Sequence, residues 1–547
     1  MNFPNAFELA GLWDFDFTET GADPQMLFKD VAPVPGCFDL MPGYYLKRGT
    51  GSYRRFIEIG GMVELYSEGL GLRGEIFWDG EKIAEVDAPF SKNIFRFDAG
   101  EFKKHELIIS VNNEFDDSNS SLWHRNYDFY AHGGIYRRIA IRQAEKIFER
   151  EIKIITSNIE RGEVEITLDL DGETANISNA KITFDNSAKE FSLELKQGKG
   201  KGMFAVPDFK LWSPESPSLH TVSIKAGDVV FEKTFGIRKV EAKNGKIYLN
   251  GKQLHLIGYN RHDAHPDFGY AVPSAVHCHD LQLLKQQKAN CIRGSHYPQS
   301  EEFLDFCDRM GVLVWEESLG WGNNEAALTD PDFQAKQICE TRKMALASIN
   351  HPCIILRGFL NEAATSLASA KPLVKKLADT LREVDPSCLV TYGSNVGSRD
   401  VCTEFVDVIS YNTYPCWYSG NEDQFVNYSE IKRALGELEE FASEDKFKNK
   451  PLLISEAGAE AMPNLHGGQR WSEEYQADLL EGIIRYITES DRYSGIFLWQ
   501  FCDTRTYISN TSQVRAGNFN LKGVLDRHRI PKESWRRIAQ LLKEYKF

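Results

Sequence analysis

Residues 452–460 read LLISEAGAE, and this stretch combines the pattern of a buried strand with a carboxylate at its end. Leu452, Leu453 and Ile454 form the short apolar run expected of a strand that is covered on both faces. Glu456 follows two residues later, although burying an ionised carboxylate without partners is costly. The stretch therefore predicts a core strand that delivers an acidic group to one end of a sheet.

The same pattern recurs along the second half of the chain, with amphipathic helical segments between the repeats. Apolar strands that alternate with helices indicate a parallel sheet covered by helices, and eight such strands indicate a closed (β/α)8 (TIM) barrel. An open doubly wound sheet would need a glycine-rich phosphate turn after its first strand, and GYNRHDAH (258–265) has none. The eight strand candidates are 254–260, 289–297, 312–318, 353–362, 388–394, 407–414, 451–457 and 495–503.

The first 240 residues show a different pattern of apolar and polar residues. Short alternating runs such as GEIFWDGEKIAEVD (74–87) and EVEITLDLDGE (163–173) are separated by Gly, Asn and Asp. Alternation with frequent turn residues is typical of antiparallel β-sandwiches, and a change near 143–154 indicates two of them in succession. The fold prediction is a multidomain β plus α/β protein. We divide the chain into 1–145, 146–238 and 239–547, the last being the barrel.

The amino-acid composition restricts the classes of molecule that the chain is expected to bind. The chain has 547 residues and a formal net charge of −15, from 64 basic and 79 acidic residues. Nucleic acids and anionic membranes both require a basic surface, so neither is expected as a partner. The N-terminal residues show no basic segment followed by an apolar one, and no apolar run approaches ~18–20 residues. The predicted location is the cytoplasm. The oligomeric state stays open, with a homo-oligomer among the options.

Cysteines and histidines give no sign of a metal site. The ten cysteines form no CxxC pair and no regular spacing, which favours reduced core thiols over disulfides or metal ligands. The histidine spacing matches no ligand set, so hydrogen bonding to sugar or core groups is the preferred interpretation. We expect no metal and no cofactor. The histidines considered are His262, His265, His277, His279 and His351.

Polar and aromatic residues cluster where the predicted barrel strands end. The carboxyl ends of barrel strands converge on one face, which is where TIM-barrel enzymes carry their active sites. Two carboxylates surrounded by aromatic rings and hydrogen-bonding groups suit a sugar, which has apolar faces and a rim of hydroxyls. The strand-end residues are Asn260, Arg261, His262, Asp263, Arg293, His296, Tyr297, Asn361, Glu362, Tyr411, Asn412, Tyr414, Glu456, Trp499 and Asp503.

The two glutamates fit the needs of glycoside hydrolysis, in which one carboxyl protonates the leaving oxygen and the other attacks the anomeric carbon. We assign Glu456 as the nucleophile, with Arg293 and Tyr414 as neighbours that keep it ionised. Glu362 is the general acid/base and needs an elevated pKa for its first step. Retention of configuration requires the two carboxyl groups to lie about 5–5.5 Å apart.

Several motifs resemble glycoside hydrolase family 2 over essentially the full chain: NGKQLHLIGYNRHDAH (250–265), IRGSHYP (292–298) and the NE of 361–362. The resemblance implies an N-terminal jelly-roll-like sugar-binding sandwich, an immunoglobulin-like sandwich and a catalytic barrel. It assigns the same roles to the two glutamates as the chemistry does. It also implies that Asn361 binds the sugar 2-hydroxyl, that His296 binds another hydroxyl, and that Trp499 forms the floor of the sugar site.

Within that family the segments RWSEEYQADLL (470–480), NTYPCWY (412–418) and NLKGVLDRHRIPK (520–532) most resemble those of β-glucuronidases. A lysine ammonium and an amide donor neutralise a uronate, whereas a neutral sugar would leave the cation unpaired. The resemblance implies that the substrate carboxylate is held by Asn520 and Lys522, with Arg515 beside them. By the same resemblance Asp128 binds sugar hydroxyls and Tyr418 is a second pocket tyrosine.

Three departures lie beside the expected pocket. No proline follows Glu362 in RGFLNEAAT, Ala457 stands where an aromatic residue is usual, and strand 8 reads WQFCDTR. These changes concern sugar stereochemistry and aglycone preference more than the reaction.

Together, the strand-end residues and the motifs predict a retaining exo-β-glycosidase that acts on small-molecule β-D-glucuronides without a cofactor. The alternatives are the same chemistry on β-galacturonides, β-galactosides or β-mannosides, and a non-catalytic carbohydrate-binding protein.

Overall fold

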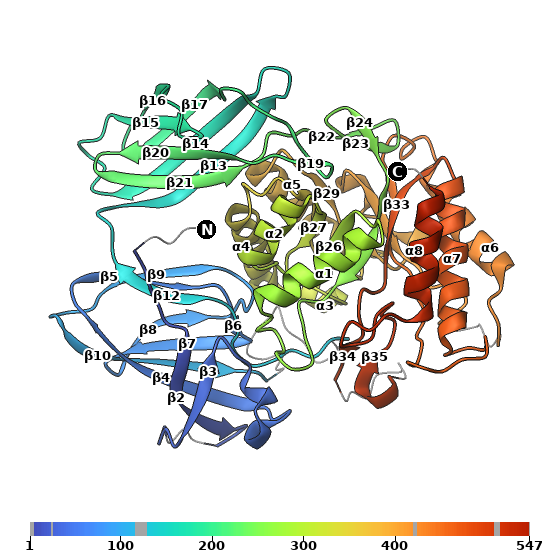
Figure 1. Cartoon of the computed structure of the whole chain (residues 1–547), viewed down its shortest axis with the longest axis horizontal. Coiled ribbons are helices and arrows are strands. Elements are labelled where there is room, and N and C mark those ends of the chain that lie inside the picture. Colours follow the sequence, from blue (N-terminus) through green and yellow to red (C-terminus); the bar gives the residue numbers. More distant parts are fainter. Residues whose placement is uncertain (1–4, 23–25, 115–127, 419–423, 508–514, 546–547) are drawn as a thin grey trace.

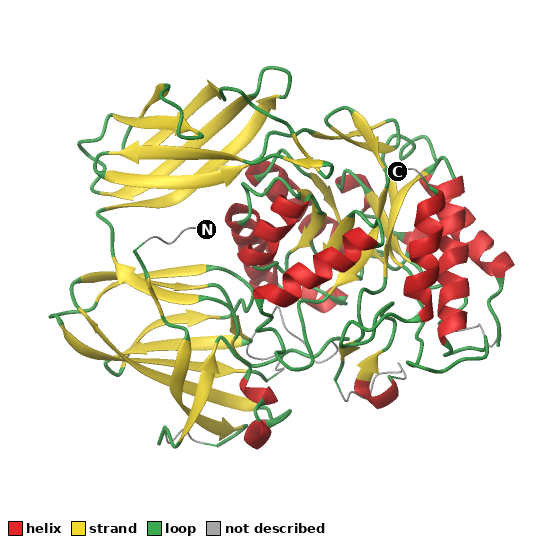
Figure 2. Cartoon of the chain, in the orientation of Figure 1, coloured by secondary structure: helices red, strands yellow, loops and turns green. Residues whose placement is uncertain are grey.

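The computed structural model describes residues 5–22, 26–114, 128–418, 424–507 and 515–545. Two β-sandwiches lie one above the other, and both flank a barrel covered by helices (Figure 1, Figure 2). The predicted fold class, two sandwiches followed by a TIM barrel, is confirmed.

The first sandwich packs a four-stranded sheet against a six-stranded one. Side chains from both sheets, including Trp13 and Phe15 from one and Val63 and Ile141 from the other, meet in a single core. All strand pairs are antiparallel. The sheet orders are β1-β12-β5-β9 and β3-β2-β4-β10-β7-β8. The strands are β1 (Phe7–Glu8), β2 (Gly11–Glu19), β3 (Asp30–Val34), β4 (Gly49–Ile59), β5 (Met62–Ser67), β7 (Arg73–Trp78), β8 (Glu81–Val86), β9 (Asn93–Asp98), β10 (Lys103–Asn112) and β12 (Ile139–Gln143), with a small pair β6 (Leu70–Gly71) and β11 (Gly134–Ile135) and two turns η1 (Phe38–Leu40) and η2 (Pro42–Tyr44).

The second sandwich has sheets of three and four strands. Buried and partly exposed residues alternate along β14 (Glu163–Gly172), as expected for a strand with one face on the core. Val164, Ile166 and Leu168 from this strand pack against Ile182 and Ile224 of the other sheet. The sheet orders are β13-β14-β17 and β16-β15-β20-β21. The remaining strands are β13 (Ile147–Asn158), β15 (Asn179–Phe184), β16 (Glu190–Glu194), β17 (Lys199–Ala205), β18 (Trp212–Ser213), β19 (Ser216–Pro217), β20 (His220–Ala226) and β21 (Val229–Phe235).

A three-stranded ribbon leads into the barrel, whose strands pair in parallel in the order β29-β28-β27-β26-β25-β33-β32-β31-β30. Only Tyr392 separates β29 from β30, so these two short segments form one strand and the nine labels describe an eight-stranded barrel. Each predicted strand segment overlaps one barrel strand. The ribbon is β22 (Val240–Lys243), β23 (Lys246–Leu249) and β24 (Lys252–Leu254), and the barrel strands are β25 (Leu256–Arg261), β26 (Cys291–Gly294), β27 (Leu313–Glu317), β28 (Ile354–Gly358), β29 (Leu389–Thr391), β30 (Gly393–Ser394), β31 (Ile409–Asn412), β32 (Leu452–Glu456) and β33 (Tyr493–Leu498).

Helices cover the outside of the barrel, and several of them begin at a side-chain N-cap. The Ser472 side chain accepts a hydrogen bond from the Tyr475 backbone at the start of α7, and Ser300 and Asp330 do the same for α2 and α4. The helices are α1 (Ser274–Gln286), α2 (Glu301–Met310), α3 (Glu325–Thr329), α4 (Pro331–Ala347), α5 (Lys371–Val384), α6 (Tyr428–Ala442), α7 (Glu473–Glu489) and α8 (Glu533–Glu544); the short turns are η3 (Ala368–Ala370), η4 (Gly397–Arg399), η5 (Thr403–Phe405) and η6 (Ala516–Asn518). Two short strands, β34 (Thr504–Arg505) and β35 (Phe519–Asn520), form a ribbon after the eighth barrel strand.

An aromatic contact joins the first sandwich to the barrel. The rings of Phe90 and Tyr297 stack with centroids 4.0 Å apart and planes within 8°. The Tyr270 hydroxyl donates to the Tyr130 carbonyl at 3.0 Å, and the Tyr130 backbone donates to the Arg505 carbonyl at 2.9 Å. These contacts fix the loop that carries residue 128 beside the end of the eighth barrel strand.

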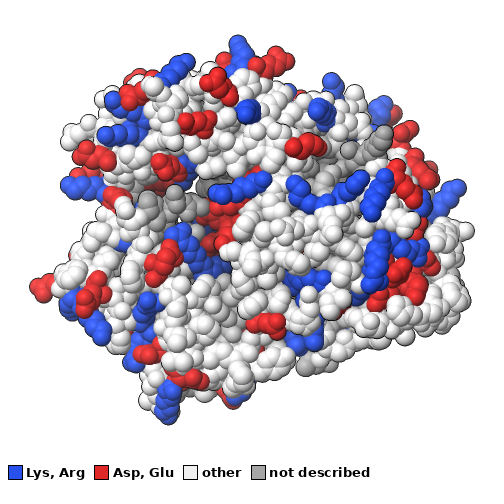
Figure 3. Space-filling view, viewed as in Figure 1, with Lys and Arg blue, Asp and Glu red and all other residues white. Residues whose placement is uncertain are grey.

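The cysteines and the molecular surface match the compositional expectations. All ten cysteines are free thiols, and eight of them are buried, as predicted. Lys and Arg alternate with Asp and Glu over the face drawn in Figure 3, and no broad area of one sign covers it. Within the described ranges, no helix has the length and apolar character that crossing a bilayer requires.

Candidate active site

Glu456 occupies the last position of β32, a strand whose five residues are all buried. One carboxylate oxygen, Oε1, lies 2.8 Å from Nη1 of Arg293, and the other accepts a hydrogen bond of 2.6 Å from the Tyr414 hydroxyl. The strand thus ends among donors. The hydrogen bond from the guanidinium and the hydrogen bond from the phenol together offset the free-energy cost of desolvating the carboxylate.

Arg293, on β26, is held in place by several neighbours besides Glu456. Its Nε donates to Glu317 at 2.6 Å, and its two terminal nitrogens donate to Asn260 at 2.9 Å and Asn361 at 2.8 Å. Its guanidinium carbon lies 4.5 Å from the centre of the Trp315 ring. Because these contacts use donors on every side, the guanidinium presents a fixed edge to the carboxylate.

Glu362 lies four residues beyond β28, with a left-handed backbone (φ 52°). Burial, reinforced by the negative charge of Glu456, raises the pKa of this carboxyl to about 8. Asn412 donates to its Oε1 at 2.9 Å, a contact that acts in the opposite direction and is outweighed. In the barrel sheet Asn412 also pairs with Glu456, so this asparagine lies between the two carboxyl groups.

His296 and Asn361 direct unsatisfied polar atoms into this region. His296 Nδ1 lies 3.0 Å from Glu317, and its Nε2 is buried without a hydrogen-bond partner among the described residues, as is Nδ2 of Asn361. Burial and the charge of Arg293 lower the pKa of His296 to about 3, so its ring is neutral at pH 7. Trp499 stacks on this ring with centroids 5.3 Å apart and planes within 9°. Buried polar atoms without partners mark places where a ligand or water can bind.

A second cluster lies next to the glutamate pair and is built around Lys522. The lysine is fully buried, and its Nζ donates to Glu460 at 3.1 Å. The same ammonium lies 5.0 Å from the ring centre of Tyr418 and 5.9 Å from that of Tyr414, which bonds Glu456. Tyr414 therefore lies beside both clusters.

Asp128, from the first sandwich, completes this second cluster. Arg515 donates through Nε to one oxygen of Asp128 at 2.9 Å and also bonds its other oxygen through Nη2. The Asn520 amide donates to Asp128 at 3.1 Å. Arg515 also bonds Glu460 and lies 3.4 Å from the Tyr418 hydroxyl. The structure thus brings together all the residues that the sequence assigned to a uronate pocket.

Sequence reasoning missed Glu460, which is fully buried and bonds both Arg515 and Lys522 through one oxygen. Its second oxygen is buried without a hydrogen-bond partner in the described structure. Two carboxylates, Asp128 and Glu460, therefore balance the two cations of this cluster. A second carboxylate four residues after Glu456, at the end of LLISEAGAE, was the available signal.

Glu317 was also missed as a site residue. It terminates β27 and contacts both Arg293 and His296, which in turn face Glu456. Burial raises the pKa of Glu317 to about 7, against the opposing charge of Arg293. The pair of glutamates in VLVWEES (312–318) was its only trace in the sequence.

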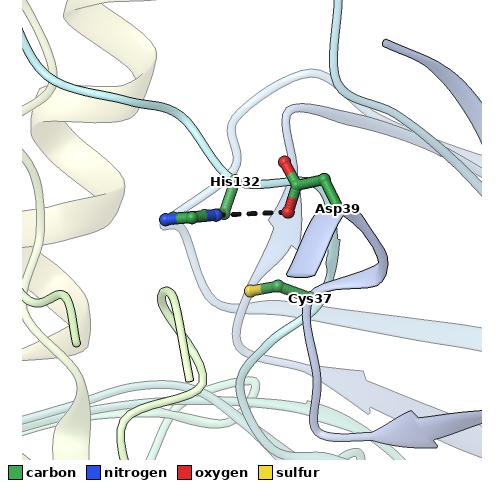
Figure 4. A group of neighbouring side chains, drawn as sticks. All are labelled: Cys37, Asp39 and His132. Carbon is green, nitrogen blue, oxygen red and sulfur yellow. Dashed lines mark hydrogen bonds and ion pairs between the residues drawn. The ribbon is translucent and has the colours of Figure 1, made fainter. Parts of the chain in front are cut away.

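Two groups in the described structure bring three metal-type ligand atoms within 4.8 Å of one another. In the first, Cys37 and Asp39 at the turn η1 lie beside His132, which precedes β11 of the first sandwich (Figure 4). The Asp39 oxygens already accept from His132 at 3.1 Å and from the Gly133 backbone at 3.1 Å. In the second group, Asp308 is bonded by His351 and by the Cys353 backbone. These hydrogen bonds give both carboxylates a structural role.

Comparison with known proteins points in one direction. Residues 240–547 match the family model for the TIM-barrel domain of glycosyl hydrolases family 2, and residues 142–238 match a second model of that family. A β-glucuronidase of Streptococcus agalactiae is 26% identical over 99% of this chain and 96% of its own length. A β-galactosidase of Thermoanaerobacterium thermosulfurigenes is 28% identical over 86% of this chain and 65% of its own length.

Among solved structures, the β-galacturonidase of Eisenbergiella tayi bound to galacturonate has a TM-score of 0.90 and 28% identity, covering 99% of this chain and 97% of that chain. The likeness extends over both sandwiches and the barrel.

Proposed function

The chain belongs to glycosyl hydrolase family 2, and from this premise we propose that it is a retaining exo-β-glycosidase that hydrolyses β-D-glucuronides. It is a glycoside hydrolase by family. The observation that carries the mechanism is the unequal pair of carboxyl groups. Glu362 has a pKa raised to about 8, while Glu456 accepts hydrogen bonds from Arg293 and Tyr414.

The first step divides the work between these two groups. Glu362 donates its proton to the glycosidic oxygen as the carbon–oxygen bond breaks, and a carboxylate oxygen of Glu456 forms a bond to the anomeric carbon. The aglycone leaves as a neutral alcohol, and the sugar remains as an ester of Glu456. Arg293 and Tyr414 orient the attacking carboxylate, and Tyr414 stays within reach of its second oxygen.

The second step reverses the roles. Glu362, now ionised, removes a proton from a water molecule whose oxygen attacks the anomeric carbon, and the bond to Glu456 breaks. Glu362 recovers its proton and Glu456 its charge. Two inversions at one carbon give a sugar with the β-configuration of the substrate.

Sugar hydroxyls fit the unsatisfied atoms around the pair. If His296 keeps its proton on Nδ1, toward Glu317, its Nε2 offers a lone pair to a hydroxyl, while the Asn361 amide offers a proton. The flat Trp499 ring beside His296 supplies an apolar floor for the sugar face.

The Lys522 cluster favours an acidic sugar. A buried ammonium, a guanidinium and an amide in one pocket are suited to a carboxylate, which Lys522, Arg515 and Asn520 would bind in exchange for Asp128 or Glu460. Asp128, once displaced from Arg515, is free to accept from sugar hydroxyls. A β-galacturonide presents the same carboxylate, and the likeness to a galacturonate-bound relative favours it as the second candidate.

A panel of aryl β-glycosides tests the proposal: glucuronide, galacturonide, galactoside and mannoside. The glucuronide should give the largest kcat/KM, and Lys522→Ala should reduce this value by at least about tenfold with little change on the galactoside. Lys371→Ala, which removes an exposed lysine paired with Glu404, is the matched control. Faster turnover of the galactoside, unaffected by Lys522→Ala, would disprove uronate recognition.

The mechanism has its own test. Glu456→Gln should abolish turnover of every aryl glycoside in the panel, because an amide cannot form the ester. Substantial remaining activity would remove Glu456 as the nucleophile. Proton NMR of the first-formed sugar should show the β-anomer, and an α-anomer would rule out the two-step route.

A further inference from the structure

A cavity of about 380 Å³ is bordered by the β34–β35 ribbon. In this ribbon Arg505 pairs with Phe519 and Thr504 pairs with Asn520. Successive side chains of a strand point to opposite faces, so Phe519 and Asn520 face opposite ways. Asn520 reaches Asp128 in the active site, whereas Arg505 and Phe519 line the cavity. Thr504 also lines the cavity, so the ribbon borders the cavity and carries Asn520, which bonds Asp128.

Two arginines line this cavity, Arg505 and Arg527. The guanidinium carbons of Arg505 and Arg527 lie 4.8 Å and 4.9 Å from the centre of the same Phe519 ring. Neither arginine forms an ion pair with a carboxylate in the described part of the chain, although the protein as a whole has a charge of −15. Both guanidinium groups contact the same ring, which places two cationic side chains on the lining of one cavity.

The other lining groups do not neutralise the pair. Asp503 lines the cavity but is engaged by Lys532 at 2.8 Å, and burial raises its pKa to about 7. Asp267 is an exposed carboxylate on the cavity rim, 3.8 Å from His265. His528 adds a further donor to the lining. The cavity thus offers guanidinium and imidazole nitrogens, the donor set of an anion site.

We propose that this cavity binds a small anion through Arg505 and Arg527, and that the bound anion tunes the affinity of the active site. The shared chemistry is a phosphate or carboxylate group, which forms paired hydrogen bonds with a guanidinium fork. Arg505 uses one nitrogen to donate to the Tyr45 hydroxyl at 2.9 Å, which orients the group and leaves other donors available.

The ribbon provides the coupling. The Arg505 carbonyl accepts from the backbone of Tyr130, two residues after Asp128, and Asn520 bonds Asp128 itself. An anion that draws the Arg505 side chain toward Arg527 acts on the same two-residue ribbon that positions Asn520. The expected effect is on KM for the glycoside, because the ribbon carries Asn520, a proposed ligand of the sugar carboxylate, whereas Glu362 and Glu456 are bonded by Asn412 and Tyr414.

The test is calorimetric titration of the full chain with inorganic phosphate at constant ionic strength. The double variant Arg505→Gln/Arg527→Gln should bind at least about tenfold more weakly than the unmodified protein. Arg399→Gln, which changes an exposed arginine on η4, is the control and should bind normally. Equal affinity in the double variant, or the absence of phosphate and glucuronate binding at this cavity, would overturn the proposal.

A second arm distinguishes the source of the anion. Free glucuronate should bind in two equivalents to the unmodified protein and in one to the double variant if a sugar carboxylate is accepted in the cavity. One equivalent in both, with phosphate binding intact, assigns the cavity to phosphate. The phosphate arm does not depend on glycosidase activity, so its failure leaves the proposed function standing. An unchanged KM for the glycoside in saturating phosphate would disprove the coupling.

Discussion

Glu362 is the residue whose environment sets the pH range of the reaction. Its raised pKa of about 8 means that this carboxyl, the proposed general acid, is protonated below that pH and loses its proton above it. We therefore expect kcat/KM for a glycoside with a poor leaving group to fall as the pH rises through about 8. The pH–rate profile of an alkyl glucuronide measures this decline, which is the alkaline limb of the profile.

Two variants check the origin of that limb. Asn412→Ala removes a hydrogen bond that lowers the pKa, so the limb should move to higher pH. Glu362→Gln should eliminate the limb, with kcat on the same substrate reduced about 10²–10⁴-fold.

The same carboxyl group affects stability. Because its pKa is raised in the folded state, ionisation above pH 4.5 disfavours folding. Glu362→Gln should thus unfold at a higher temperature than the unmodified protein at pH 8 and at the same temperature at pH 4.

Glu460 gives a prediction about selectivity. It balances Lys522 and Arg515, so Glu460→Gln leaves the pocket with one extra positive charge while keeping the side-chain volume. The ratio of kcat/KM for glucuronide to that for galactoside should rise about tenfold, since only the uronide carries a charge. A fall in this ratio would show instead that Glu460 is needed to hold the two cations in position.

Sequence reasoning at this scale recovered the clustered residues at the barrel strand ends and missed two carboxylates, Glu317 and Glu460, that bond to them. Glu456, Arg293 and Tyr414 were expected together, and the structure places them in contact. Glu460 and Glu317 were not expected, because a carboxylate that pairs with a buried cation looks the same in a sequence as any glutamate near a strand end. Which cation each one meets depends on the strand register and on loops from other segments.

At the scale of elements, Gly458 lies two residues after β32 and packs against Trp499, the residue that follows β33. A Cβ at this position would lie 2.0 Å from the Trp499 carbonyl oxygen, so Gly458→Ala must displace backbone beside Trp499, the proposed floor of the sugar site. We expect a loss of about 1–3 kcal/mol in the free energy of unfolding and an increased KM for the glycoside. Denaturant unfolding and steady-state kinetics measure the two effects.

Gly436 provides the control for that substitution. It lies within α6, and a Cβ there would meet only the Tyr486 hydroxyl, at 3.5 Å. Gly436→Ala should raise the free energy of unfolding by up to about 1 kcal/mol and leave KM unchanged. A similar loss of stability in both variants would contradict the contact proposed for Gly458.

The barrel strands were predictable because each is buried on both faces and reads as a continuous apolar run. The division of the fifth strand at Tyr392 was not, since its sequence, LVTYGS (389–394), shows no break. The β34–β35 ribbon was also not predicted. Its two-residue strands carry no periodic pattern, and their pairing depends on the return of the chain after the eighth barrel strand.

At the scale of the molecule, the active site depends on how the first sandwich docks on the barrel. Phe90 stacks on Tyr297, the residue after His296, and is only 3% exposed. Phe90→Ala should lower the free energy of unfolding by about 3–5 kcal/mol and raise KM, because the sandwich also carries Asp128. Thermal unfolding and kinetics test both parts.

Phe102→Ala, which truncates a ring that is 78% exposed on the same sandwich, is the matched control and should change stability by less than about 0.5 kcal/mol. If Phe90→Ala lowers stability without changing KM, the sandwich does not position Asp128 through this contact.

The internal ion pairs of the Lys522 cluster have a consequence for the end of the catalytic cycle. An acidic sugar set free in a pocket of unpaired cations would be retained strongly and would inhibit the next turnover. In the proposed reaction Asp128 and Glu460 return to Arg515 and Lys522 as the sugar acid departs, so its exit leaves neither cation without a partner. The enzyme would thus give up some ground-state affinity and gain tolerance of the hydrolysed sugar acid as it accumulates.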